Sequence, residues 1–241
     1  MAAWRQSTKG SAIPDSVGAN QARLIPLRRP PVLVLQDDPW VTDRAPLRLV
    51  DERWEALCRD NPRYFDGEAL QVLGVIRNGH GGVTIHVART SYRQYAVQRT
   101  GIDTGTRTLG VKGLCRTPEG TWLMGKRSSE VAFYPSEWEF VPGGSVEAGR
   151  SLSDTILGEL SEESGWEAVG SPQAVAVIYD PSAFSWEVVY LLDVRPGSTP
   201  PTEAWEYARI ESIPAGSEPE PLASVARQMT RIRDGVTHDR S

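Results

Sequence analysis

Cysteine and histidine are scarce in this chain. Its 241 residues contain two cysteines, Cys58 in an expected helix and Cys115 in an expected strand. A pair so separated is more often two buried thiols than a disulfide or a metal site, so we expect no bridge. The three histidines are His80 in a turn, His86 in a strand and His238 near the end. They form no partner pattern, and we expect no catalytic role for them.

Long apolar runs and basic runs are also absent. Residues 1–19 lack the apolar stretch of a signal peptide or a membrane-spanning helix, so we expect a flexible tail, no membrane partner and a cytoplasmic location. The net charge of -5 and the lack of a basic run argue against binding a nucleic acid polymer. A small anionic substrate that is held through a metal ion remains compatible with this charge.

The chain shows no internal repeat and no low-complexity tract, and 39% of its residues are hydrophobic. This content suffices for one sizeable core or two small ones. We expect a flexible N-terminal tail at 1–19, an accessory region at 20–105, the chemically active domain at 106–235 and a C-terminal tail at 236–241, which should fray.

The accessory region is expected to be rich in β-structure. Its expected strands are 24–27, 32–35, 70–76 and 83–88, and its expected helices are 47–59 and 91–98. The turn at 78–82, Asn-Gly-His-Gly-Gly, joins the last two strands into a hairpin because its residues accept positive φ.

The second half of the chain alternates strands with two helices. The expected strands are 109–115, 122–125, 139–141, 175–179, 187–194 and 207–213. A final helix is expected over 221–234, with Leu222, Val225, Met229 and Ile232 toward the core.

The segment from Gly143 to Trp166 carries the clearest chemical signal. We expect a short strand that leads into a glycine loop, followed by a helix that Ser151 or Ser153 caps. Gly165 is expected to end this helix in a left-handed conformation. The helix places Glu159, Glu162 and Glu163 at positions i, i+3 and i+4, which project together from one face. Such clustered carboxylates repel one another unless a cation lies between them, and oxygen ligands suit Mg2+ or Mn2+.

These residues resemble the signature of the Nudix hydrolases. Starting at Gly144, the chain matches the signature at Glu159, Leu160, Glu162, Glu163, Gly165 and Trp166. It departs at Arg150 and Gly158, where the family usually carries a Glu and an Arg that pair and brace the loop against the helix. Losing both partners leaves no buried charge unpaired if Arg150 points to solvent. The resemblance implies an α/β fold, the Nudix α/β/α sandwich with a mixed β-sheet, here with an N-terminal β-rich extension.

Further segments resemble one branch of that family, the UDP-glucose pyrophosphatases. They are Asn61 to Asp66, Thr90 to Arg93, Leu109 to Val111 and Lys126 to Ser128, together with the altered signature at residues 144–166, here called the box. The resemblance implies metal-dependent hydrolysis of a UDP-sugar to UMP and a sugar 1-phosphate. The implied partner is a small nucleotide-sugar, and the resemblance also permits a homodimer.

The resemblance implies Mg2+, or Mn2+, as the cofactor. We expect Glu159 and Glu163 to be direct metal ligands and Glu162 to bind metal directly or through water, and these three are the expected catalytic residues. The general base stays open: it is one of the three or a later carboxylate, with Glu206 a better candidate than Glu187.

Substrate contacts are expected from Gly144 in the box loop and from Glu206. Arg93 and Arg127 suit phosphate oxygens, and Lys112 is a weaker candidate. Aromatic rings suit a uracil or a hexose, and the candidates are Tyr92, Trp138, Phe184 and Trp186, each of which has core packing as its alternative.

Two other functions remain open at the level of the sequence. One is a Nudix-fold module that binds or senses a nucleotide-sugar without turnover. The other is a Nudix hydrolase of a different substrate, such as ADP-ribose or another nucleotide.

Overall fold

The computed structural model describes residues 22–202 and 204–238. The expected tail at 1–19 and the last three residues of the expected tail at 236–241 lie outside this part. Residues 236–238 form the end of helix α4 (Ser224–His238), so this helix begins later and ends later than the sequence predicts.

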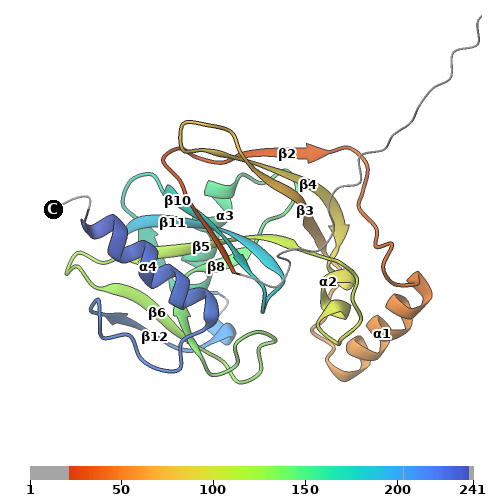
Figure 1. The fold of residues 1–241 in the computed structure, drawn as a ribbon. Helices are drawn as coiled ribbons and strands as arrows, with labels where there is room; N and C mark the ends of the chain where they lie inside the picture. Colours follow the sequence, from red (N-terminus) through yellow and green to blue (C-terminus); the bar gives the residue numbers. More distant parts are fainter. Residues whose placement is uncertain (1–21, 203, 239–241) are drawn as a thin grey trace, which may run out of the picture.

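A large mixed β-sheet forms the centre of the molecule (Figure 1). Its main path runs β1-β10-β11-β5-β3-β4-β2. The strands on this path are β1 (Arg23–Pro26), β2 (Val32–Gln36), β3 (Glu68–Arg77), β4 (Val83–Ser91), β5 (Thr108–Arg116), β10 (Gln173–Asp180) and β11 (Ser185–Pro196). The pairs β11–β5 and β2–β4 are parallel, whereas the other neighbours on this path are antiparallel. The mixed α/β fold class predicted from the sequence is confirmed.

Five further strands attach to the sides of this path. They are β6 (Trp122–Arg127), β7 (Trp138–Phe140), β8 (Gly143–Ser145), β9 (Trp166–Ala168) and β12 (Tyr207–Ile213). Strands β8 and β9 are not among the strands expected from the sequence, and β8 lies in the expected glycine loop. Strand β8 forms because residues 143–145 pair with residues 110–112 of β5, a partner distant in sequence.

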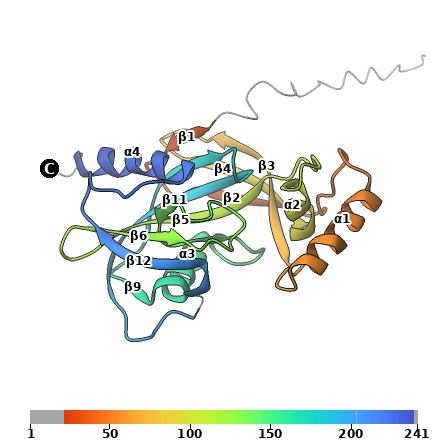
Figure 2. The same cartoon turned by 90° about the horizontal axis from the view of Figure 1, so that it is seen from below.

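The helices cover the sheet on both faces, as Figure 2 shows for α3 (Leu152–Glu159) and α4. Alternate side chains of a strand point to opposite faces. On β5, Leu109 and Val111 pack in one core cluster with Ile156 of α3, and Leu114 packs in the other cluster with Met229 of α4. The expected inward side of the last helix is confirmed for Val225, Met229 and Ile232, and Leu222 is buried just before the helix begins.

The accessory region extends the sheet of the second half of the chain. Residues 23–26 of β1 pair with β10, and Gln71 of β3 pairs with Thr108 of β5. Helices α1 (Leu47–Asp60) and α2 (Tyr92–Gln98) pack against each other beside β3, through Val50 and Val97 among others (Figure 2). The accessory region thus reaches the middle of the sheet.

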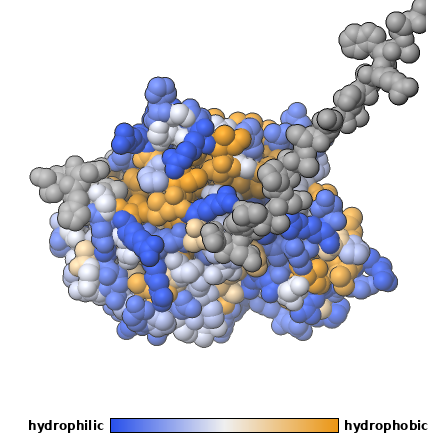
Figure 3. Space-filling view, viewed as in Figure 1, coloured by the Kyte–Doolittle hydropathy of each residue, from blue (hydrophilic) through white to orange (hydrophobic). Residues whose placement is uncertain are grey.

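Some apolar side chains remain at the surface. Figure 3 shows apolar surface on the face seen in Figure 1. Exposed large apolar residues of β1 to β3 include Leu24, Val32, Leu35, Leu73 and Ile76. None of the described helices combines the length and apolarity needed to cross a membrane. Neither cysteine forms a disulfide: Cys115 is buried and Cys58 half-buried, as free thiols.

Candidate active site

The glycine loop brings the box helix against the sheet. A side chain at Gly143 would have its Cβ 2.5 Å from Lys112 Nζ, and one at Gly144 would have its Cβ 2.1 Å from the carboxyl carbon of Glu159. Both distances are far below ordinary contact. Glycine at these two positions therefore lets the lysine of β5 and the glutamate of α3 approach the loop backbone.

The box helix begins and ends as the sequence predicts. Ser151 caps its start, since its Oγ accepts a hydrogen bond from the Asp154 backbone N–H at 3.0 Å. Gly165 ends it in the left-handed conformation with a φ of 68°. Between these points the helix is not uniform: α3 ends at Glu159 and a π-helical turn, η1 (Leu160–Ser164), follows.

The π-helical turn corrects the assumption of regular spacing. A π-helix closes i→i+5 hydrogen bonds and makes a wider turn than an α-helix, so Glu162 and Glu163 do not stand at α-helical angles from Glu159. Glu159 lines a cavity, and Glu163 is 2% exposed. Glu162 is half-buried and is not among the described residues that line this cavity. The three carboxylates thus occupy three different environments.

Glu163 is a buried acid among other acids. The backbone N–H of Gly143 donates to its Oε2 at 3.1 Å. Burial raises the pKa of Glu163 well above its usual value, and the charges of Glu206 and Glu159 raise it further, while Lys112 opposes the rise. A proton or a cation at Glu163 would remove the repulsion between its carboxylate and those of Glu206 and Glu159.

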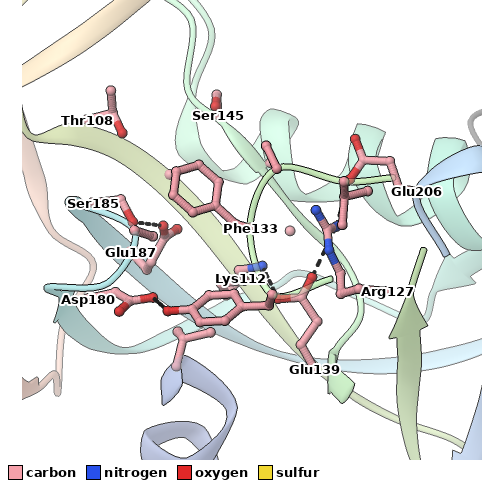
Figure 4. A pocket seen from close by; sticks show the side chains of 18 of the residues that line it. Thr108, Lys112, Arg127, Phe133, Glu139, Ser145, Asp180, Ser185, Glu187 and Glu206 are labelled. Atoms are coloured by element: carbon pink, nitrogen blue, oxygen red, sulfur yellow. Dashed lines mark hydrogen bonds and ion pairs between the residues drawn. The ribbon is translucent and has the colours of Figure 1, made fainter. Parts of the chain in front are cut away.

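The cavity has a volume of about 350 Å³ and is lined by residues of the box and of the accessory region. Figure 4 shows it from close by. Its walls come from β5, from the loop at 128–137 between β6 and β7, from β8 and α3, from the turn at 180–187 and from η2 (Ala204–Glu206). Helix α2 of the accessory region adds Tyr92 and Tyr95. The volume is within the range of small-molecule sites.

A network of buried charges crosses one side of the cavity. Glu139 is 2% exposed and receives Lys112 Nζ at 2.7 Å, Arg127 Nη1 at 3.2 Å and the Tyr207 hydroxyl at 2.9 Å. Arg127 also pairs with Glu206 at 2.7 Å. Burial alone would raise the pKa of Glu139, but Lys112 and Arg127 outweigh it and hold this pKa below its usual value. Glu139 is therefore a fixed anion that holds both cations at the cavity.

Glu187 lies on the other side of the cavity. It is 8% exposed, and Ser185 Oγ donates a hydrogen bond to its Oε1 at 2.6 Å. Burial raises its pKa to about 7, against the opposing charge of Lys112. Gly110 makes room for this side chain, because a Cβ there would lie 2.3 Å from Glu187 Oε2.

The donor chemistry around the cavity fits a divalent cation, although no ready cluster exists. Within the described residues, no three His, Cys, Asp or Glu side chains gather as a metal-binding group. Yet Glu159 and Glu206 line the cavity, and the buried carboxylate of Glu163 is within electrostatic reach of both. Carboxylate oxygens are the ligands that Mg2+ and Mn2+ prefer.

The other expected substrate residues divide into two groups. Tyr92, Arg127, Gly144 and Glu206 line the cavity. Arg93 is not among the lining residues, because Asp51 holds its Nη1 at 2.7 Å and Asp66 lies 3.6 Å from its Nε.

The aromatic residues considered in the sequence also separate. Trp138 is buried in the core, Trp186 packs on Tyr179, and Phe184 lies under the Arg107 guanidinium, so among the candidates only Tyr92 lines the cavity. The other aromatic lining residues, which were not among the candidates, are Tyr95, Phe133, Tyr134 and Trp205. Tyr95 had a usable signal, because it follows Tyr92 by three positions on a helix and therefore shares its face.

The altered box positions contact each other. A Cβ on Gly158 would lie 2.0 Å from Arg150 Nη2, and this same atom donates to the Asp154 carbonyl at 3.1 Å. Arg150 is half-buried and hydrogen-bonded, so it is not left as an unpaired buried charge. It lies over Gly158, so an arginine still joins the loop to the helix but comes from the loop.

Comparison with known proteins finds a family model that matches this chain. Residues 106–231 match the model of the NUDIX domain. A curated relative, an uncharacterized Nudix hydrolase of Streptomyces coelicolor, is 32% identical over 95 residues, which are 37% of this chain and 52% of that protein. The chain thus spans about half the length of this relative.

Solved structures give a likeness of fold alone. The MutT protein of Methanosarcina mazei Go1 aligns at 20% identity and a TM-score of 0.42, over 53% of this chain and 93% of that chain. The NUDIX domain of Shewanella oneidensis NrtR, solved with ADP ribose, aligns at 18% identity and a TM-score of 0.41, over 55% of this chain and 89% of that chain.

Proposed function

The chain belongs to the Nudix family, and on this premise we propose that it hydrolyses the pyrophosphate bond of a nucleoside diphosphate-linked sugar. The proposed substrate is a UDP-sugar, UDP-glucose or UDP-galactose, and the products are UMP and a sugar 1-phosphate. The observation that carries the proposal is the cavity, which Glu159, Glu206, Lys112 and Arg127 line together and whose charges act on the buried Glu163.

We propose that Glu159 and Glu163 hold Mg2+, or Mn2+, with Glu162 as a further ligand or a contact through water. Bound cations screen phosphate oxygens and lower the pKa of an attacking water. The charge of the cavity supports a role for a bound cation. Its described walls contain more carboxylates than Lys and Arg side chains, so an anionic pyrophosphate would be repelled without a cation.

We propose that residues lining the cavity position the substrate. Arg127 is the proposed phosphate contact: in the described part of the chain its Nε is buried without a hydrogen-bond partner, which suits an oxygen-rich ligand. Gly144 allows the phosphates to approach the loop backbone, and Tyr92 offers a ring to the base. Glu206 is the proposed later carboxylate that accepts a proton from water or orients the metal. Arg93 contacts substrate only after releasing Asp51 and Asp66.

The assay that tests this function measures UMP release from UDP-glucose with Mg2+. We expect UMP and glucose 1-phosphate in equal amounts, and no release with EDTA. ADP-ribose in the same assay tests the alternative substrate, since the box does not select the base. If no nucleotide-linked substrate yields a phosphate-ester product while Mg2+ still binds, the enzyme proposal is wrong.

A second candidate function is nucleotide-sugar binding without turnover. It is favoured by the lack of a ready three-carboxylate cluster among the described residues. Calorimetry with UDP-glucose, read beside the turnover assay, separates the two functions: binding with no product supports the sensor.

A cytoplasmic location and a homodimer are also part of the proposal. The exposed Val32 and Leu35 of β2, at the end of the main sheet path, offer an apolar contact for a second copy. Sedimentation equilibrium tests the dimer, and a mass equal to that of a single chain would contradict it.

A further inference from the structure

The cavity has two chemically different sides. On one side lie Arg127, Glu139 and Glu206, and on the other lie Ser185 and Glu187, as Figure 4 shows. The first side is built from ion pairs. The second offers a hydroxyl and a buried carboxyl group.

The carboxyl group of Glu187 is held by a hydroxyl rather than by a cation. Ser185 Oγ donates to it at 2.6 Å, while the nearby Lys112 ammonium is committed to Glu139 at 2.7 Å. Gly110 leaves the space for Glu187 Oε2 beside β5. This arrangement suits a ligand that brings neutral donors to a fixed acceptor.

Aromatic rings complete this side. Tyr95 and Phe133 line the cavity, and their rings stack with centroids 5.6 Å apart. The Tyr95 hydroxyl donates to the Ala183 carbonyl at 2.7 Å, and the Arg99 guanidinium lies 4.2 Å from the Phe133 centroid. These two contacts hold the rings in place.

We propose that this side is a polyol subsite in which Glu187 and Ser185 hydrogen-bond the sugar hydroxyls of the substrate, beside the rings of Tyr95 and Phe133. The inference rests on the proposed function and deepens it, because it says where the sugar lies. A polyol presents O–H groups that donate to a carboxyl oxygen and C–H faces that pack on aromatic rings, which is the chemistry of this side. The phosphates then lie toward Arg127.

Asp180 also lines the cavity but has a different role. Its Oδ1 accepts from the Ser182 backbone N–H at 3.0 Å and from Ser224 Oγ at 3.1 Å, and the Tyr134 hydroxyl donates to Oδ2. These bonds fix the loop at 128–137 to the start of α4. Asp180 is therefore a matched control: a buried acid near Glu187 whose oxygens are already used.

The test compares two substrates that differ in the sugar alone. One is UDP-glucose, and the other is UDP esterified with methanol, which keeps both phosphates but has no polyol. We expect Glu187→Ala to lower the ratio of kcat/KM for UDP-glucose to kcat/KM for the methyl ester by about tenfold to a hundredfold, since a hydrogen bond to a carboxyl group is lost. Glu187→Gln, which keeps the shape, should give a smaller loss. Asp180→Asn should lower the melting temperature and leave the ratio within twofold.

Within one pair, an equal loss on the sugar substrate and on its methyl ester would mean that Glu187 acts on the reaction common to both and does not bind that sugar. ADP-ribose, compared with ADP methyl ester, is the second arm. A loss in either pair supports the subsite and identifies the sugar, and a loss in neither contradicts it.

Calorimetry keeps the inference separate from turnover. With Mg2+ present, the wild type should bind UDP-glucose or ADP-ribose more tightly than the matching methyl ester, and Glu187→Ala should abolish this difference. Should catalysis be absent while the difference persists, the proposed hydrolysis fails and the subsite stands. Should catalysis be present with no such difference, the subsite fails and the hydrolysis stands.

Discussion

Gly144→Ala tests whether close approach of the loop to Glu159 is needed for activity. The new Cβ would lie 2.1 Å from the carboxyl carbon of Glu159, whereas ordinary contact begins at 3.4 Å. The carboxyl group must therefore move by at least 1.3 Å, the difference between these two distances. A displacement of about 1 Å at a reacting centre can cost about a hundredfold in rate, so we expect kcat for UDP-glucose to fall about a hundredfold.

Stability should change little in this variant, because the group that must move is the end of a flexible side chain and the backbone at Gly144 is outside the left-handed region. The matched control is Gly74→Ala in β3, where a Cβ meets nothing within 4 Å. The assays are steady-state UMP release and thermal melting, with Mn2+ titration by electron paramagnetic resonance. If Gly144→Ala keeps kcat within threefold of the control, Glu159 has no metal or substrate role at this position.

Three further outcomes follow from the buried groups. Glu139→Gln should lower the free energy of unfolding in urea by about 3 kcal/mol, because a buried anion between two cations is removed; a loss below 1 kcal/mol would mean that the cations find other partners. Burial raises the pKa of Glu187 from 4.5 to about 7, so the folded state holds the proton of this carboxyl group more tightly than the unfolded state does. The contribution of Glu187 to stability is therefore fully present below pH 4.5 and is lost as the pH rises through 7. The unfolding free energy of the wild type relative to Glu187→Gln should therefore fall by about 3 kcal/mol across this window, and a flat difference would contradict the burial of this acid. Burial also raises the pKa of the Cys115 thiol, so a disulfide reagent at pH 8 should modify only Cys58 in the native protein and both thiols in denaturant.

Local patterns in the sequence predict much of the fold. The hairpin around residues 78–82, the cap at Ser151 and the left-handed stop at Gly165 are confirmed, because each depends on a few neighbouring residues. Strand β8 is different, because its pairing with β5 depends on residues that are distant in the chain. The π-helical turn after Glu159 is also absent from the pattern, since the same residues fit a regular helix.

The cavity is less predictable than the box. Glu159 and Arg127 could be selected as chemically suited residues, but the ion pairs that join Arg127 to Glu139 and Glu206 unite three separate elements. The aromatic loop residue Phe133 has no periodic neighbours that would place it at the site. Its position depends on stacking with Tyr95, which belongs to the accessory region.

We propose that the carboxylates of the box hold a metal ion that hydrolysis requires. The most direct measurement is Mg2+-dependent UMP release from UDP-glucose by the wild type and by Glu163→Gln, with the exposed Glu119→Gln as control. We predict that the wild type and the control need Mg2+ and turn over equally, and that Glu163→Gln loses at least about a hundredfold in kcat/KM, since removing a group used in the reaction costs several kcal/mol. Turnover by Glu163→Gln at the wild-type rate and the same Mg2+ concentration would contradict the account.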